Sequence, residues 1–217
     1  MKVQRSSGAM LFRTSAPRDP RFAVLVLHGG SADSTAAVGR WSLAALRLWP
    51  VARSVARSMP GAAVYRLRNS VRGWNGDGAA VLGDAHWALD RITATHPGVP
   101  LIAVGHSLGG RVSAHLAEAG AVAGLVGLAP WFKPDDPVTG LRGVPVAVVQ
   151  GTRDRMVPTP STEPWLARAQ AAGAVVRRSV VDGGEHAMLR HYRRWDRLTA
   201  ESIGWVSDTT QHCVRTR

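Results

Sequence analysis

Ser107 lies within the stretch Gly105-His106-Ser107-Leu108-Gly109-Gly110 and is the side chain best placed to act as a nucleophile. The stretch fits the G-x-S-x-G pattern, in which a serine sits on a sharp turn between a strand and a helix. An apolar run, 101–104, comes before it, and a segment with helical spacing, 111–119, comes after it. The pattern therefore predicts nucleophilic catalysis by Ser107.

A serine hydroxyl is a weak nucleophile and needs a base and an orienting acid. Asp154 follows the apolar run 144–150, and His186 follows the alternating run 175–181 on a glycine-rich loop. Both are expected at the carboxyl ends of strands, where open α/β sheets gather their chemistry. The order Ser, Asp, His along the chain favours Asp154 as the acid. Three other carboxylates could take its place: Asp135, Asp136 and Asp182.

Backbone donors for an oxyanion are expected from two places. The apolar run 22–27 leads into His28-Gly29-Gly30-Ser31, and such a loop can turn the N–H of Gly30 inward. The N–H of Leu108, directly after the candidate nucleophile, would be its partner. His28 is expected to make structural hydrogen bonds that shape this loop.

Four linked segments occur in one order along the chain: HGGS at 28–31, GHSLGG at 105–110, GTRDRMVP at 151–158 and GGEHAM at 183–188. In these segments the chain resembles the α/β-hydrolase superfamily. The resemblance implies a mostly parallel central sheet of about eight strands, or fewer, flanked by helices. It implies Ser107 as nucleophile, His186 as general base and Asp154 as the acid that orients the imidazole. The region before Phe22 is short, so the first strands are expected to be abbreviated or absent.

The resemblance implies a serine hydrolase that cleaves a carboxylic ester, or a related acyl bond, through an acyl-enzyme and without a cofactor. Activity should rise from acidic to mildly alkaline pH, because a histidine must be neutral to act as base. The same scaffold also serves thioesterases, acyltransferases, peptidases and cofactor-free peroxidases. A non-catalytic binding protein with a basic face is a further alternative.

Substrate contacts are expected close to the nucleophile and the acid. The connection 130–143 contains three prolines and is too short for a cap domain, so we expect an open site. The predicted substrate-binding residues are Trp131, Trp74, His106 and Met156. The aromatic residues among them could instead cover the edge of the core.

Besides the helix at 111–119, the positions of apolar residues predict four further helices, at 38–59, 79–95, 161–172 and 188–206. Pro50 should kink or divide the first of them. Beyond residue 207 a loose tail is expected. Strand and helix signals alternate without repeats or a low-complexity linker, which predicts a single α/β domain over 1–217.

The chain has 217 residues and a formal net charge of +12, carried almost entirely by arginine, since Lys2 and Lys133 are its only lysines. This charge could attract anionic membranes, polyanions or acidic substrates. We favour the interpretation that this charge comes from arginines spread along solvated helix faces. No motif for reading nucleic acid is evident, so a small-molecule acyl substrate is the expected partner.

Other sequence features predict a cytoplasmic protein without stable membrane insertion. No apolar stretch reaches the ~20 residues needed to span a bilayer, and the first residues show no apolar signal core. The one cysteine, Cys213, can form no internal disulfide. No cluster of cysteine and histidine has zinc spacing, so no metal is expected.

Overall fold

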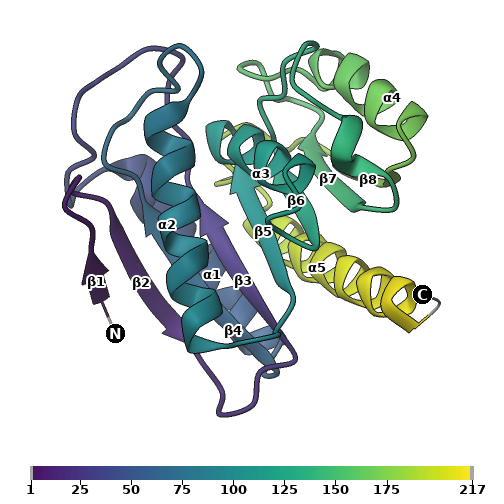
Figure 1. Ribbon diagram of the computed structural model, residues 1–217. Helices are drawn as coiled ribbons and strands as arrows, with labels where there is room; N and C mark the ends of the chain where they lie inside the picture. The colour runs from purple at the N-terminus through teal and green to yellow at the C-terminus, as the bar shows by residue number, and fades with distance from the viewer. Residues whose placement is uncertain (1, 216–217) are drawn as a thin grey trace.

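The protein is built on one eight-stranded sheet (Figure 1), seen in a computed structural model that describes residues 2–215. Beyond residue 211 only the backbone is described, so the side chain of Cys213 lies outside the described part. The strand order is β1-β2-β4-β3-β5-β6-β7-β8. The bounds are β1 Lys2–Gln4, β2 Met10–Ser15, β3 Phe22–Leu27, β4 Ala62–Arg68, β5 Leu101–His106, β6 Gly124–Leu128, β7 Pro145–Gly151 and β8 Val175–Val181.

The six strands β3 to β8 run parallel, and β1 and β2 pair antiparallel at one edge. The mostly parallel sheet of about eight strands is thus confirmed. The first strands are present but short, with three residues in β1 and six in β2.

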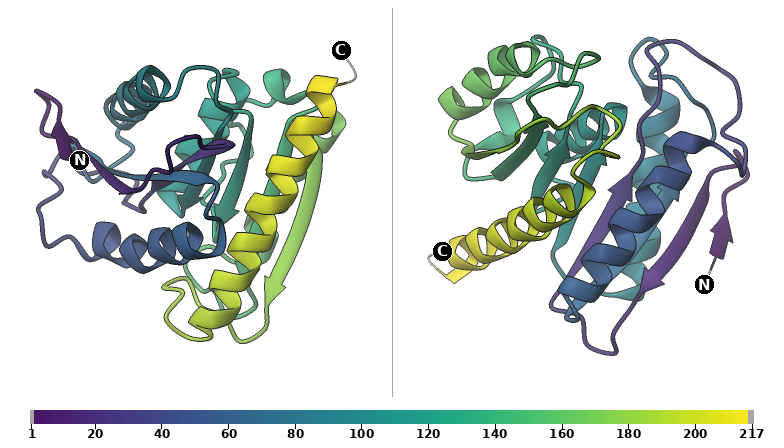
Figure 2. Two further views of the ribbon diagram at one scale, coloured as in Figure 1. Left: turned by 90° about the horizontal axis from the view of Figure 1, so that it is seen from below. Right: turned by 180° about the vertical axis from the view of Figure 1, so that it is seen from behind.

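Helices cover both faces of the sheet (Figure 2). Their bounds are α1 Leu43–Ser58, α2 Ala79–Thr95, α3 Leu108–Glu118, α4 Glu163–Ala171 and α5 Tyr192–Arg215. One apolar core joins α2, α3 and α4 to the sheet, and a second joins α1 and α5 to its other face. Every residue of β3, β5, β6 and β7 is buried, as expected for parallel strands covered on both sides.

The first helix begins later than predicted, at Leu43 instead of residue 38. The preceding segment is tied to a neighbouring loop instead, since the Val38 N–H donates to the Ser70 carbonyl and Ala37 bridges Val71. Pro50 lies inside α1 without dividing it.

The last helix is displaced toward the C-terminus relative to the prediction. Met188 and His191 have positive φ values of 58° and 56°, so the chain turns before α5 begins. The expectation of a loose tail beyond residue 207 is wrong, because α5 continues to Arg215. The hydroxyl of Thr209 donates back to the Trp205 carbonyl, and that of Thr210 to the Val206 carbonyl.

The connection between β6 and β7, residues 129–144, contains only the short 3-10 helix η1, Thr139–Leu141. No cap domain is inserted there, which confirms that expectation for the described chain. The other 3-10 helix, η2 Thr159–Ser161, precedes α4. None of the helices described between residues 2 and 215 combines the length and the apolar character needed to cross a bilayer.

Candidate active site

Ser107 occupies the turn between β5 and α3 with φ 53° and ψ −117°, a left-handed conformation that costs a non-glycine residue energy. The backbone around it is tied down on both sides. Its N–H donates to the Leu128 carbonyl at 3.1 Å, and its own carbonyl accepts from the Trp131 N–H at 3.0 Å. The turn therefore holds the hydroxyl at the carboxyl edge of the sheet.

The glycines of the pattern are required by close backbone approach. A Cβ at Gly105 would collide with the backbone of Gly109, and one at Gly109 would collide with the Leu27 carbonyl. Helix α3 can therefore begin directly above β5 and β3 only if both positions lack a side chain.

Asp154 and His186 are joined by a hydrogen bond in which Nδ1–H of His186 donates to Oδ2 of Asp154 at 2.8 Å. The Asp154 side chain is fully buried. Its other oxygen, Oδ1, accepts the backbone N–H groups of Met156 at 2.9 Å and Val157 at 2.8 Å. The carboxylate is thus fixed in one orientation and leaves Nε2 of His186 as the free ring nitrogen.

The turn that carries Ser107 and the loop that carries His186 meet at the side chain of His106. Its ring lies 4.8 Å, centroid to centroid, from that of His186, and its Nε2–H donates to the His186 carbonyl at 2.8 Å. Because His106 directly precedes Ser107, this contact places the His186 loop against the turn. The Ser107 hydroxyl makes no hydrogen bond to His186 in the described chain, and such bonds are often long without substrate.

The His106 ring is held neutral. Burial, followed by the charge of neighbouring His186, lowers the pKa of His106 to about 3. Its Nδ1 is buried and has no hydrogen-bond partner among the described residues.

The free energy of unfolding is expected to fall as the pH drops below about 6.5, in part through His106. An unfolded histidine has a pKa of about 6.5, so the unfolded chain takes up this proton before the folded chain does. The stabilisation that neutral His106 contributes to the folded chain is fully present above the unfolded pKa and is lost as the pH falls toward 3. At pH 5 the loss from this one group is about 2 kcal/mol relative to pH 7.5.

Urea unfolding of wild type and His106→Gln at both pH values measures this contribution. Glutamine retains a donor for the His186 carbonyl but does not titrate. The pH-dependent loss should therefore be smaller in the variant by about 2 kcal/mol, while the loss from other histidines cancels in the comparison. An equal loss in both proteins would contradict the assignment.

The loop 28–31 is held against the nucleophile turn. A Cβ at Gly29 would lie 3.2 Å from the Ser107 Cβ, and one at Gly30 would lie 2.5 Å from the Leu108 Cδ2. None of the hydrogen bonds found between residues 2 and 215 uses the Gly30 N–H. Leu108 is the first residue of α3, so its N–H has no acceptor within the helix. Gly30 and Leu108 are therefore close together with their N–H groups available.

His28 holds this loop in place, as predicted. Its Nδ1–H donates to the Gly29 carbonyl at 2.7 Å, and its Nε2 accepts the Asn69 N–H at 3.1 Å. Burial lowers the pKa of His28, which keeps the ring neutral and able to accept.

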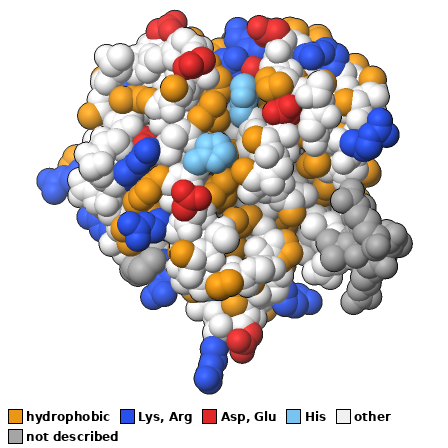
Figure 3. All heavy atoms as spheres, viewed as in Figure 1, with side chains coloured by type: hydrophobic (Ala, Val, Ile, Leu, Met, Phe, Trp, Pro, Cys, Tyr) orange, Lys and Arg blue, Asp and Glu red, His pale blue; other side chains and the backbone are white. Residues whose placement is uncertain are grey.

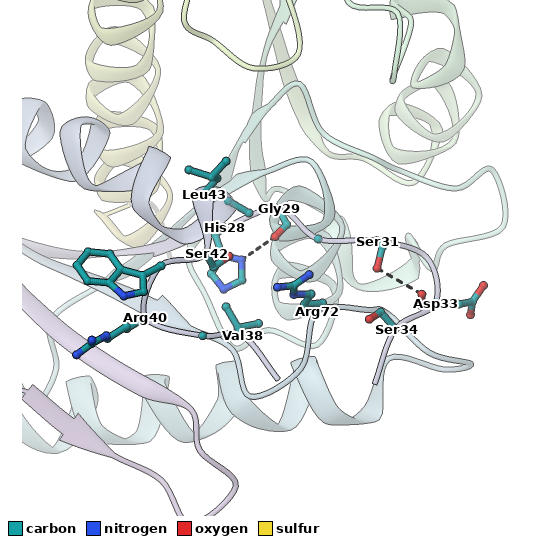
Figure 4. Close-up of a pocket in the computed structure, with 14 residues that line it drawn as sticks. His28, Gly29, Ser31, Asp33, Ser34, Val38, Arg40, Ser42, Leu43 and Arg72 are labelled. Carbon is teal, nitrogen blue, oxygen red and sulfur yellow. Dashed lines mark hydrogen bonds between the residues drawn. The ribbon is translucent and has the colours of Figure 1, made fainter. Parts of the chain in front are cut away.

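Two pockets open beside these residues. The larger has a volume of about 930 Å³ and lies between the loop 28–34 and the segment 38–44 (Figure 4). Arg72 also lines it. The smaller, of about 420 Å³, is lined by His186 itself and by Met156, which is 76% exposed. The candidate oxyanion donor Gly30 thus lines the larger pocket, and His186 lines the smaller one.

The predicted tryptophans lie near the turn but line neither of these two pockets. Lys133 and Arg111 lie 5.0 Å and 5.2 Å from the centre of the Trp131 ring. Trp74 is buried, with Arg111 3.9 Å from the centre of one face and His115 beside it. Substrate contact by either ring stays a prediction.

The competing carboxylates have other partners. Asp136 accepts hydrogen bonds from Arg111 and His115, and Asp182 accepts from the Thr152 hydroxyl at 3.2 Å. Asp135 is exposed. Of the four candidates, Asp154 is the one hydrogen-bonded to His186.

Three arginines that line the cavity beside His186 were not predicted from the sequence: Arg153, Arg155 and Arg190. The first two flank the candidate acid Asp154, and this position was the signal that could have drawn attention to them. Among the described residues, no group of three or more His, Cys, Asp or Glu side chains could hold a metal ion.

The family described as serine aminopeptidase, S33, matches residues 68–144, a span that includes Ser107 and Leu108 but not Asp154 or His186. No curated protein sequence matches the chain. The fold is shared with many solved structures. An alpha-beta serine hydrolase homologue from Coxiella burnetii is 17% identical with a TM-score of 0.70, over 94% of this chain and 96% of its own.

Two further structures extend this comparison. An acetyl ester-xyloside bifunctional hydrolase from Caldicellulosiruptor lactoaceticus is 14% identical with a TM-score of 0.69, over 93% of this chain and 90% of its own. A serine hydrolase without lid from Xanthomonas campestris is 18% identical with a TM-score of 0.68, over 94% of this chain and 92% of its own. These structures share the fold of this chain over nearly its whole length, whereas the family match is confined to residues 68–144. The chain is a small protein of the α/β-hydrolase fold that lacks a cap domain between β6 and β7.

Proposed function

We propose that the protein is a serine hydrolase that cleaves carboxylic esters, with Ser107 as nucleophile, His186 as general base and Asp154 as the orienting acid. The observation that carries this proposal is the buried Asp154–His186 pair, held at the turn that carries Ser107. A fixed carboxylate, an imidazole and a serine on a strained turn are the components of an acyl-transfer centre.

The proposed reaction begins with substrate bound so that its carbonyl carbon lies next to the Ser107 hydroxyl. Nε2 of His186 takes the hydroxyl proton as the oxygen attacks, and Asp154 stabilises the imidazolium that forms. The N–H groups of Gly30 and Leu108 stabilise the negative oxygen of the tetrahedral intermediate. His186 then protonates the leaving alcohol, and water, activated in the same way, releases the acid from Ser107.

Esters are favoured over other acyl compounds because one similar structure is named as a hydrolase of an acetyl ester. No cap lies over the site, so small or accessible substrates of any acyl class can reach it directly. The family match to serine aminopeptidases favours peptide bonds as the second candidate, because the matched segment carries the nucleophile turn. Comparing ester, thioester and amide substrates of one acyl group separates these reactions.

Labelling with a fluorophosphonate tests the proposal before any substrate is known. Such a probe phosphonylates a serine that a base and an oxyanion site have activated. Wild type is expected to bind one equivalent, and peptide mapping should place it on Ser107. His186→Gln, which keeps Ser107 but removes the base, should label far more slowly. A well-folded wild type that takes up no probe would overturn the proposal.

A further inference from the structure

Three arginines surround the exposed edge of the catalytic histidine. The side chain of Asp154 is fully buried, whereas its neighbours Arg153 and Arg155 are exposed. Together with Arg190, from the loop before α5, they line the cavity of about 420 Å³ that His186 also lines. Glu185 is the only acid in that lining.

Among the described residues, no side chain forms an ion pair with the guanidinium groups of Arg153, Arg155 or Arg190. Three cations against one acid leave the cavity lining with a net positive charge. A concave site with one sign of charge raises the local concentration of ligands of the opposite sign.

The other side of the centre has the same sign of charge. Arg40 and Arg72 line the pocket beside Gly30, where Asp33 is the only acid (Figure 4). On the face drawn in Figure 3, Lys and Arg are scattered and form no continuous patch. A further basic cavity, lined by Arg13, Arg53, Arg57 and Arg66, contains none of the candidate catalytic residues. Positively charged side chains therefore line both the pocket that contains Gly30 and the cavity that contains His186.

We propose that the cavity lined by Arg153, Arg155 and Arg190 binds an anionic oxygen group, a carboxylate or a phosphate, on the substrate. The protein's substrates are then acyl esters that carry a negative charge. Guanidinium groups suit this role because their paired N–H donors match the oxygens of both anions. The inference rests on the proposed function, because it takes His186 as the base beside which the charged group is held.

Two esters of matched length test the preference. Mono-4-nitrophenyl adipate carries a terminal carboxylate where 4-nitrophenyl hexanoate carries a methyl group, and both release the same alcohol. Wild type should hydrolyse the adipate with a kcat/KM at least about tenfold higher, the ratio expected of one charge-assisted hydrogen bond. Raising the salt concentration should reduce the ratio, because exposed charges are screened.

The triple variant Arg153→Gln/Arg155→Gln/Arg190→Gln should lower the adipate-to-hexanoate ratio about tenfold. The matched control is Arg18→Gln/Arg91→Gln/Arg142→Gln, which removes the same charge from exposed arginines at the opposite edge of the sheet. It should keep the wild-type ratio. A wild-type ratio near one, or an equal drop in both variants, would overturn the proposal.

The failure of this inference is distinguishable from the failure of the proposed function. If wild type hydrolyses the neutral hexanoate and Ser107→Ala does not, the proposed function stands, whatever the adipate-to-hexanoate ratio of kcat/KM is. Calorimetric titration of Ser107→Ala with each ester tests the cavity without turnover, and tighter binding of the adipate supports it. Equal binding of the two esters would reject it. Competition by methyl phosphate and by acetate then tells which anion the cavity prefers.

Discussion

Replacing Ser107 with alanine is expected to lower kcat for an activated ester by about 10⁴-fold or more. In the proposed mechanism the hydroxyl is the group to which the acyl chain is transferred, and the stretch 105–110 contains no other hydroxyl or thiol. The fold should persist, because the backbone of residue 107 makes the hydrogen bonds that hold the turn. Steady-state hydrolysis of 4-nitrophenyl acetate, together with the thermal unfolding midpoint, measures both effects.

Ser202→Ala is the matched control for this variant. Ser202 is also buried, and it lies on α5, away from the nucleophile turn. The Ser202→Ala variant makes the same chemical change and should leave kcat near the wild-type value. Wild-type turnover by Ser107→Ala, in a preparation free of other esterases, would remove Ser107 from the mechanism.

The parts of the site that could be predicted from the sequence depend on local geometry. The turn that carries Ser107 could be predicted from Gly105 and Gly109, because only glycine allows α3 to start so close to β5 and β3. Asp154 and His186 could be paired in advance because parallel strands end at the same edge of the sheet. Strands β3, β5 and β7 could be predicted because they are buried on both faces, which gives each of them an unbroken apolar run.

Features that depend on contacts between distant segments could not be predicted. The start of α5 depends on two left-handed residues, Met188 and His191, which the apolar pattern does not reveal. The contact of the buried Trp74 ring with Arg111 of α3 was not evident either, and a role for Trp74 in substrate binding stays a prediction. The spacing of Arg190 from Arg153 along the chain likewise gave no sign that both line one cavity.

Asp154→Asn is expected to lower kcat by about 10⁴-fold while leaving the site in place. The N–H groups of Met156 and Val157 donate to one oxygen of Asp154, and they would hold the amide oxygen of asparagine in the same position. The amide NH₂ would then face Nδ1 of His186. Since an NH₂ group cannot accept, Nδ1 must become the acceptor and the proton must move to Nε2. The histidine would then be unable to take the proton from Ser107.

Asp182→Asn separates this effect from a general loss of a carboxylate. Asp182 lies in the same loop as His186, but its side chain bonds to the Thr152 hydroxyl and is exposed. Its variant should retain nearly full kcat. Steady-state kinetics on the two proteins, with nitrogen NMR shifts of the His186 ring, would show whether the tautomer changes in Asp154→Asn alone. Loss of activity in Asp182→Asn, with Asp154→Asn near wild type, would move the orienting role from one carboxylate to the other.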